Sequence, residues 1–315
     1  MSRDLALEMK CLTEQVLASP GHSDKQSARQ LPYNRTAVTA ISFRPHHRPG
    51  IRLGDTSRAT RVGILRLLDL ALSSHTYAQV TTIMGQESLV ARDSSWHKDQ
   101  QSDDYYLVVH GNPHENHRWG WRFEGHHISI TATVQGDRID VAPIFLGASP
   151  DRLLHAGQVL LHPLAAEAEL ARTTLNDMGP SGRAAAIVTR TVPREITHGS
   201  TPQARTSEPA GVRIGDLPQA AQRSLRELAC TYVNRAAPAL ATQQEQLLEK
   251  ADLTFAWLGG TRPGEEFHYL LQAEGLFIAE YGNNSHGQKT ANHVHTILRL
   301  PRSEFGGDFE PETPQ

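Results

Sequence analysis

The sequence is poor in cysteine and in aromatic residues. Its 315 residues include only two cysteines, Cys11 and Cys230, and aromatic residues make up 6% of the chain. Two cysteines so far apart form neither a thiolate metal motif nor a disulfide framework. We therefore expect two reduced, buried thiols, because a free cysteine commonly packs like a small apolar residue.

Long apolar runs and an excess of one charge are also missing. No stretch approaches the roughly 18 apolar residues of a membrane span, and the first residues, MSRDLALEMKCLTEQ, lack the pattern of a secretory signal. The net charge is -3, and no basic run is interleaved with aromatic residues, which argues against nucleic acid as a partner. We expect a cytoplasmic protein that binds neither membranes nor nucleic acids.

Motifs of common enzyme classes are absent as well. The sequence contains no Walker A motif, no GxGxxG and no GxSxG. The segment GGTRPGEE has glycines, but it lacks the lysine and the following helix of a phosphate loop. Nucleotide binding and serine hydrolase chemistry are therefore disfavoured. No internal repeat at a solenoid period is visible either.

The apolar spacing predicts helices and strands in separate blocks. Helical spacing occurs over residues 3–18, 56–74, 75–93, 164–178 and 241–251, and in a helix that we expect to begin with Asp216 as its N-cap. Two strand blocks, rich in β-branched and aromatic residues, cover about residues 103–147 and 252–301. QGDR, residues 135–138, has the composition of a hairpin turn.

This order predicts an α+β fold and excludes βαβ alternation. We expect one domain over residues 1–315, with helical parts at about 1–100 and 150–250. The mostly antiparallel strands would form one sheet or a partial barrel, packed with helices from the N-terminal and central segments. Residues 190–215 are dense in Thr, Pro, Gly, Ser and Arg and are predicted to be a long loop.

What the chain has in excess is histidine, with 17 residues in clusters. In NHVHTILRL, residues 292–300, a strand would place His293, His295 and Arg299 on one face, opposite an apolar stripe. Two imidazoles one residue apart on the same face can both direct a ring nitrogen at one metal ion. The pair alone is a short motif, but together with a second histidine cluster and a nearby glutamate it favours a metal site over a core position.

A second pair, His126 and His127, lies in GWRFEGHHISI, which we interpret as a strand. On an unbroken strand the two rings point to opposite faces, although Gly125 could allow a bulge that redirects one of them. His127 is the choice for a third metal ligand, because Ser129 and Thr131 make its face the polar one. His126 would then lie beside the metal as a proton carrier.

Two carboxylates are candidates to complete the site. Glu280 would share a strand face with apolar residues, where a charge is costly unless a metal or Arg299 compensates it. Glu124, two residues before His126, is the competing candidate. Trp119 and Trp121 would supply flat apolar walls for a small substrate.

The segments WGWRFEGHHISI, APIFLGASP, FIAEYGNN and NHVHTILRLPRSEFGGD together resemble the bacterial and fungal DUF3500 family, a domain of unknown function. The resemblance covers about residues 35–308. It implies a shared pattern without naming an activity. The residues of that pattern are Trp119, Trp121, Gly125, His126, His127, Glu280, His293, His295 and Arg299.

From the residues we expect a mononuclear non-haem Fe(II) oxygenase that acts with O2 on a small aromatic or heterocyclic metabolite. His127, His293 and His295 would hold the metal, with Glu280 completing or bracing the site. Arg299 would neutralise an anionic oxygen.

Copper or zinc are possible with the same ligands, and two alternatives stay open. In a zinc-dependent hydrolase, Glu280 or Glu124 would act as general base towards a metal-bound water. In a small-molecule-binding protein without catalysis, the histidines would bond to one another and to the backbone.

Overall fold

The computed structural model describes residues 2–19, 29–93, 103–115, 117–206, 211–285, 287 and 289–309. It consists of two compact units, each of which combines segments distant in the sequence. The first unit comprises Met1–Ile144, Arg235–Leu240 and Arg302–Gln315, and the second comprises Phe145–Asn234 and Ala241–Pro301. The expectation of one domain stays a prediction.

The sheet of the first unit is built around a meander of consecutive strands. Its strands are β1 (Gln30–Leu31), β2 (Ile51–Arg52), β3 (Tyr106–His110), β4 (Trp119–Gly125), β5 (Ile128–Gln135) and β6 (Arg138–Ala148). The strand order is β1-β3-β4-β5-β6, with β2 also paired to β3. The hairpin predicted at QGDR is confirmed, because β5 and β6 flank Gly136, whose φ is 63°.

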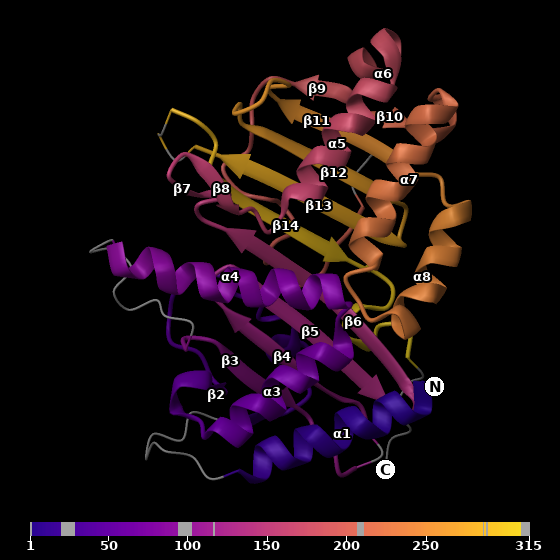
Figure 1. The fold of residues 1–315 in the computed structure, drawn as a ribbon. Helices are drawn as coiled ribbons and strands as arrows, with labels where there is room; N and C mark the ends of the chain where they lie inside the picture. The colour runs from indigo at the N-terminus through magenta and orange to yellow at the C-terminus, as the bar shows by residue number, and fades with distance from the viewer. Residues whose placement is uncertain are drawn as a thin grey trace. The chain divides into compact units, whose positions relative to one another are not determined.

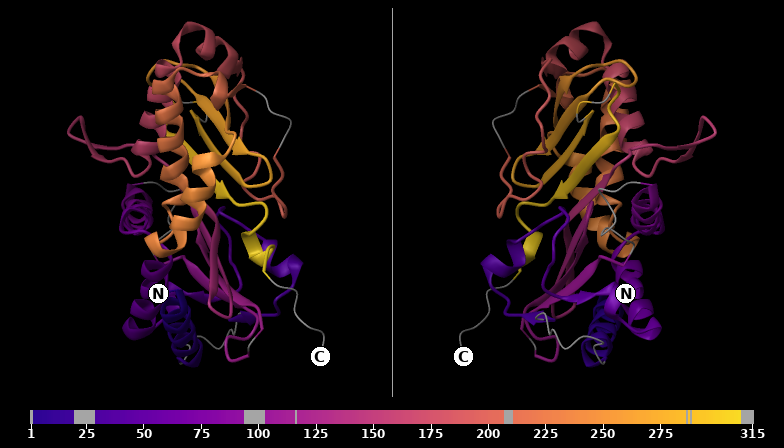
Figure 2. Two further views of the ribbon diagram at one scale, coloured as in Figure 1. Left: turned by 90° about the vertical axis from the view of Figure 1, so that its right-hand side faces the viewer. Right: turned by 90° about the vertical axis from the view of Figure 1, so that its left-hand side faces the viewer.

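Helices cover both faces of this sheet (Figures 1 and 2). They are α1 (Ser2–Ala18), α2 (Arg35–Thr39), η1 (Leu53–Asp55), α3 (Arg58–Ala71), α4 (Ser74–Asp93) and η3 (Glu304–Gly306). The long helices α1, α3 and α4 lie on one face, and α2 lies on the other. The spacing of Ile64, Leu67, Leu68 and Ala71 gives α3 its buried stripe.

The second unit contains an open sheet and a separate hairpin. Its sheet strands are β9 (Ile187–Thr189), β10 (Val212–Arg213), β11 (Thr254–Gly259), β12 (Phe267–Ala273), β13 (Phe277–Asn284) and β14 (His293–Arg299). The strand order is β6-β14-β13-β12-β11-β10, and β9 pairs with β11. Of β6, the residues from Phe145 on belong to this unit. The hairpin is β7 (Leu153–His155) with β8 (Gln158–Leu161).

The two faces of the second sheet differ. Helices α5 (Ala165–Asp177) and α7 (Gln219–Val233) cover one face, where Tyr232 of α7 bonds to Tyr269 and Thr296 of the sheet. The irregular chain after β9 covers the other face (Figure 2). The unit also contains α6 (Gly179–Ala186), η2 (Ile214–Asp216) and most of α8 (Pro238–Lys250).

The two units repeat one order of elements, which the sequence interpretation missed. The order β2-η1-α3-α4 followed by β3 to β6 recurs as β10-η2-α7-α8 followed by β11 to β14. Each copy opens with Arg, Leu or Ile, Gly and Asp, at residues 52–55 and 213–216. The buried residues Ile64 and Leu67 of α3 correspond in spacing to Leu225 and Leu228 of α7.

The predicted class, helices combined with two blocks of mostly antiparallel strands, is confirmed. Among the described residues the strand order is open at both ends, so no closed barrel forms. The predicted N-cap was wrong: Asp216 lies in the η2 turn and Pro218 is the N-cap of α7. The expected burial of the thiols was also wrong: both cysteines are free, but Cys11 is exposed and Cys230 is half-buried. Of the predicted loop 190–215, residues 207–210 lie outside the described residues, and β10 occupies its end. None of the described helices has the length and apolarity to cross a membrane.

Candidate functional site

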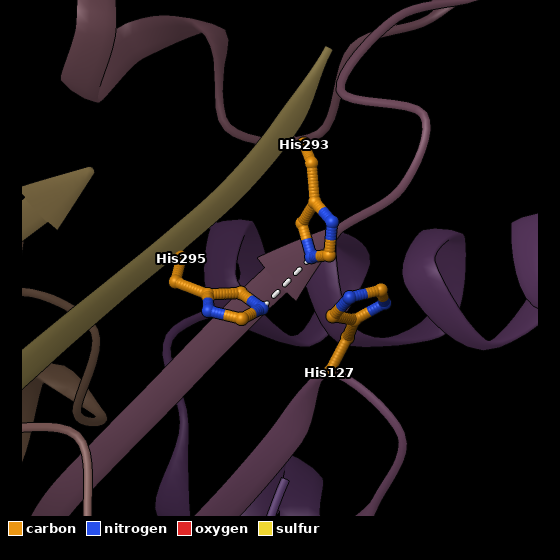
Figure 3. Close-up of side chains that lie close together, drawn as sticks. All are labelled: His127, His293 and His295. Atoms are coloured by element: carbon orange, nitrogen blue, oxygen red, sulfur yellow. Dashed lines mark hydrogen bonds between the residues drawn. The ribbon is translucent and has the colours of Figure 1, made fainter. Parts of the chain in front are cut away.

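His293 and His295 lie on one face of β14, as the alternation predicts. Their register partners on β13 are Asn284 and Gly282. The two Nε2 atoms face each other at 2.9 Å, with the rings at 87° (Figure 3). This arrangement brings two imidazole nitrogens of the second unit to one point.

Glu195 supports His295 from behind. Its Oε1 lies 2.6 Å from Nδ1 of His295. Because a carboxylate only accepts hydrogen bonds, Nδ1 is the protonated nitrogen and Nε2 carries the lone pair. A carboxylate on the far nitrogen is a common support for a metal-binding histidine. No sequence pattern pointed to Glu195, because it belongs to the aperiodic chain after β9.

The spacing of the two Nε2 atoms suits a shared metal ion. Two nitrogen ligands at about 2.0–2.1 Å from an ion are about 2.9 Å apart at a right angle and about 3.3 Å apart in a tetrahedron. The observed 2.9 Å matches two adjacent ligands of an octahedral ion. An N–H···N hydrogen bond between neutral rings has the same length, so the pair also fits the alternative without a metal.

His126 and His127 do not lie in a strand, so that prediction was wrong. Gly125 of β4 pairs directly with Ile128 of β5, which leaves the two histidines as a two-residue turn between them. His127 has a φ of 63°, a left-handed conformation that histidine adopts more readily than most residues. The turn explains how neighbouring residues of the chain can direct both rings the same way without a bulge.

Glu87 of α4 holds both rings of this turn. Its two oxygens lie 2.9 Å from Nδ1 of His126 and 2.6 Å from Nδ1 of His127, and the rings stack at 3.7 Å. Burial opposes ionisation of Glu87, but the bonds to both rings prevail and lower its pKa to about 2. One carboxylate therefore sets the tautomer of both histidines and leaves Nε2 of each ring as its ligand atom. With these hydrogen bonds in place Glu87 supports the two histidines as an acceptor, although the three residues also lie close enough together to be grouped as a candidate metal site of the first unit.

Glu280 is buried, as predicted, but four donors surround it. The backbone N–H groups of Thr197 and His198 donate to it at 2.7 and 2.8 Å. The rings of His198 and His268 lie at 2.8 and 2.9 Å. Although burial opposes ionisation, these bonds hold the pKa of Glu280 well below its usual range. The sequence predicted a positive partner for this charge and missed both histidines.

Arg299 and Glu124 are likewise bonded within their own units. Arg299 donates to the backbone oxygens of His198 at 2.7 Å and Thr201 at 3.0 Å. Glu124 accepts from Nε of Arg122 at 3.0 Å, with Arg48 3.6 Å away. Both charges are fixed by protein groups, Arg299 in the second unit and Glu124 in the first.

Trp119 and Trp121 share one face of β4 and are both buried. Nε1 of Trp121 has no hydrogen-bond partner among the described residues. Trp119 lines a cavity of about 440 Å³ in the first unit, together with Lys10 and His117. Of the two predicted substrate walls, Trp119 therefore borders a cavity of the first unit.

Comparisons with known proteins connect this site to a family. No curated protein matched the sequence, and no solved structure matched the fold. The family described as "Protein of unknown function (DUF3500)" matches residues 3–307, nearly the whole chain. The match covers all the histidines and carboxylates described above, and the chain belongs to the DUF3500 family.

Proposed function

We propose that this protein is a mononuclear non-haem Fe(II) oxygenase that acts with O2 on a small aromatic or heterocyclic metabolite. The observation that carries the proposal is the His293–His295 pair, with both Nε2 atoms at one point and Glu195 on Nδ1 of His295. Two imidazoles that share an ion leave several coordination positions open, which catalysis requires and a closed structural site does not provide.

Iron suits this pair for chemical reasons. Imidazole combined with carboxylate or water ligands is typical of non-haem iron, and the 2.9 Å spacing fits an octahedral ion. Bound Fe(II) would supply the one-electron chemistry with O2 that amino-acid side chains lack. The chain itself would hold the ion through His293 and His295 and fix the tautomer of His295 through Glu195.

The remaining predicted residues have different roles in the proposal. His126 is assigned as the proton carrier, because its ring is partly exposed and its Nδ1 lies 2.9 Å from Oε2 of Glu87. Glu280 and Arg299 are assigned to the architecture of the second unit. That His127 is a further ligand stays a prediction, based on the sequence and on its Nδ1 bond to Glu87.

The zinc hydrolase is a weaker candidate. It needs a carboxylate to act as general base, yet Glu124 and Glu280 are both bound to cationic or N–H donors. The third candidate, a small-molecule-binding protein, is favoured by one observation. The 2.9 Å between His293 and His295 equals an ordinary hydrogen bond.

The test is the metal content of freshly purified protein, measured by plasma mass spectrometry, beside a His293→Ala/His295→Ala variant. His155→Ala, at an exposed histidine of β7, is the control. We expect about one iron per chain in the wild type and the control and less than a tenth of that in the double variant. His127→Ala, measured alongside, tests the predicted further ligand.

Each metal result separates the candidates. Iron, together with O2 consumption after addition of Fe(II) and ascorbate, supports the oxygenase. Zinc in place of iron moves the proposal to the hydrolase. If the wild type holds no metal even after reconstitution with either ion, the proposal fails, and the histidine pair is a hydrogen-bonded one.

A further inference from the structure

The chain after β9 crosses the histidine face of the second sheet. Residues 194–201, called here the crossing loop, pass over β12, β13 and β14 on the side opposite α5 and α7 (Figure 2). On this face, Gly282 of β13 is the register partner of both His268 on β12 and His295 on β14, so the three residues form a row across the sheet. The crossing loop therefore lies over the row that contains His295.

Two buried charges of the sheet hold the crossing loop by its backbone. Glu280, 1% exposed, accepts from the N–H groups of Thr197 and His198, whereas Arg299, 0% exposed, donates to the carbonyls of His198 and Thr201. The carboxylate of Glu280 thus binds backbone amides of the loop, and the guanidinium of Arg299 binds its backbone carbonyls. Charge-assisted bonds of this kind are about twice as strong as neutral ones.

Gly282 gives the loop room to come close. A Cβ at this position would lie 3.1 Å from Nδ1 of His268 and 3.4 Å from Cγ2 of Ile196. The side chain of Ile196, which is 4% exposed, packs over this gap in the row. Its backbone N–H donates to Oε1 of Glu195 at 2.9 Å, and the same oxygen bonds His295.

We propose that Glu195 is a positioning residue for His295, and that Glu280 and Arg299 hold it in place through the crossing loop. The inference rests on the proposed function in one respect, namely that His295 is a metal ligand. Glu195 has a side chain that is one-third exposed and rotamer-rich, so an unanchored loop would leave it mobile. Anchoring the loop keeps the proton of His295 on Nδ1 and its lone pair on Nε2.

The first measurement is the imidazole tautomer of His295, read from ring ¹⁵N and ¹³C chemical shifts of metal-free protein. We expect the wild type to carry the proton on Nδ1. Glu195→Gln should give a mixture of tautomers, because a rotated amide can donate as well as accept, and Glu195→Asp should restore part of the wild-type signal. Glu280→Gln should perturb the same signal from a distance and speed amide exchange at residues 197 and 198.

The second measurement is Zn²⁺ affinity by calorimetry on the same proteins. Loss of a carboxylate behind a histidine ligand typically weakens metal binding about 10–100-fold. We expect this loss for Glu195→Gln and for Glu280→Gln, while Glu249→Gln, at an exposed carboxylate of α8, should leave affinity unchanged.

The two proposals fail in different ways. If wild-type protein binds no metal, the proposed function fails, and the tautomer signal alone decides whether Glu195 positions His295. If the tautomer in Glu195→Gln equals that of the wild type, the positioning role is overturned. If Glu280→Gln alters amide exchange but not the tautomer, the remote part of the inference is overturned.

Discussion

Asp140, on β6, keeps a carboxyl group where its surroundings oppose ionisation. Its Oδ1 accepts a hydrogen bond from Ser303 at 3.3 Å. Burial, with help from the nearby charges of Asp308 and Glu304, raises the pKa of Asp140 to about 8. At neutral pH the folded protein therefore retains a proton that the unfolded chain releases.

Replacing Asp140 should change how stability depends on pH. Between the unfolded pKa of 3.8 and the folded value of about 8, the folded state binds more protons, so stability falls as pH rises. The slope from one such group is at most about 1.4 kcal/mol per pH unit. Asp140→Asn should remove this slope, as measured by urea unfolding from pH 5 to 8. Asp137→Asn, at an exposed neighbour, should not.

The positions of individual site residues were predictable from the sequence where spacing along one strand determines them. The shared face of His293 and His295 follows from strand alternation alone. Their supporting carboxylates did not follow, because Glu195 is 100 residues from His295 and Glu87 is 40 residues from His127. Tertiary packing, and not a local motif, brings these residues together.

At the scale of elements, a hydroxyl cluster joins helix α7 to the sheet of the second unit. The hydroxyl of Tyr232 lies 2.7 Å from that of Tyr269 and 2.8 Å from that of Thr296. All three side chains are buried. Because Tyr232 lies on one face of α7, these hydrogen bonds fix how the helix is rotated about its own axis over β12 and β14.

Tyr232→Phe should destabilise the protein by about 1–3 kcal/mol, because it removes two buried hydrogen bonds. The matched control is Tyr281→Phe, since the hydroxyl of this buried residue has no partner among the described residues. That change should be neutral or slightly stabilising. Chemical denaturation of both variants decides the matter, and equal losses would contradict the assigned bonds.

Element type was predictable for long periodic segments and not for short ones. Strands β3 to β6 and β11 to β14 were expected, because their sequences have alternating or continuous apolar patterns. Strands β1, β2 and β10 have two residues each and exist only through their partners. The two-residue turn at His126 and His127 was missed because it lacks the usual Asn-Gly or Asp-Gly signal of a hairpin.

At the scale of the whole molecule, the first unit needs the segment after β14. Tyr33 donates to the backbone oxygen of Phe305 at 2.9 Å, and Ser303 donates to Asp140. The guanidinium of Arg118 lies 5.5 Å from the ring centre of Phe309. These contacts attach residues 302–309 to the sheet of the first unit.

Truncation after Pro301 should therefore loosen the first unit selectively. The two hydrogen bonds and the Arg118 contact alone amount to about 2–3 kcal/mol, and Arg138 adds contacts with Asp308 and Phe309. Hydrogen exchange should accelerate in peptides around Tyr33, Arg118 and Asp140, and it should stay unchanged in β11 to β13. Uniform acceleration across both units would show that they do not unfold separately.

The repeated order of elements was not recognised in the sequence, although the helices and the strand block of each copy were predicted. The copies share the Arg-Leu/Ile-Gly-Asp opening and the apolar spacing of one helix, while most other residues differ. Packing constrains which positions are apolar far more than which residue fills them. A sequence comparison by residue identity therefore overlooks what element order makes plain.

The division of the chain also has a consequence for the order of folding during synthesis. The second unit ends at Pro301, whereas the first unit, begun by the N-terminal residues, is completed by residues after 301. A ribosome that makes the chain from its N-terminus therefore finishes the later unit before the earlier one. Until then Tyr33 and Asp140 lack their hydrogen-bond partners Phe305 and Ser303, so the first unit reaches its final packing only after the whole second unit has been synthesised.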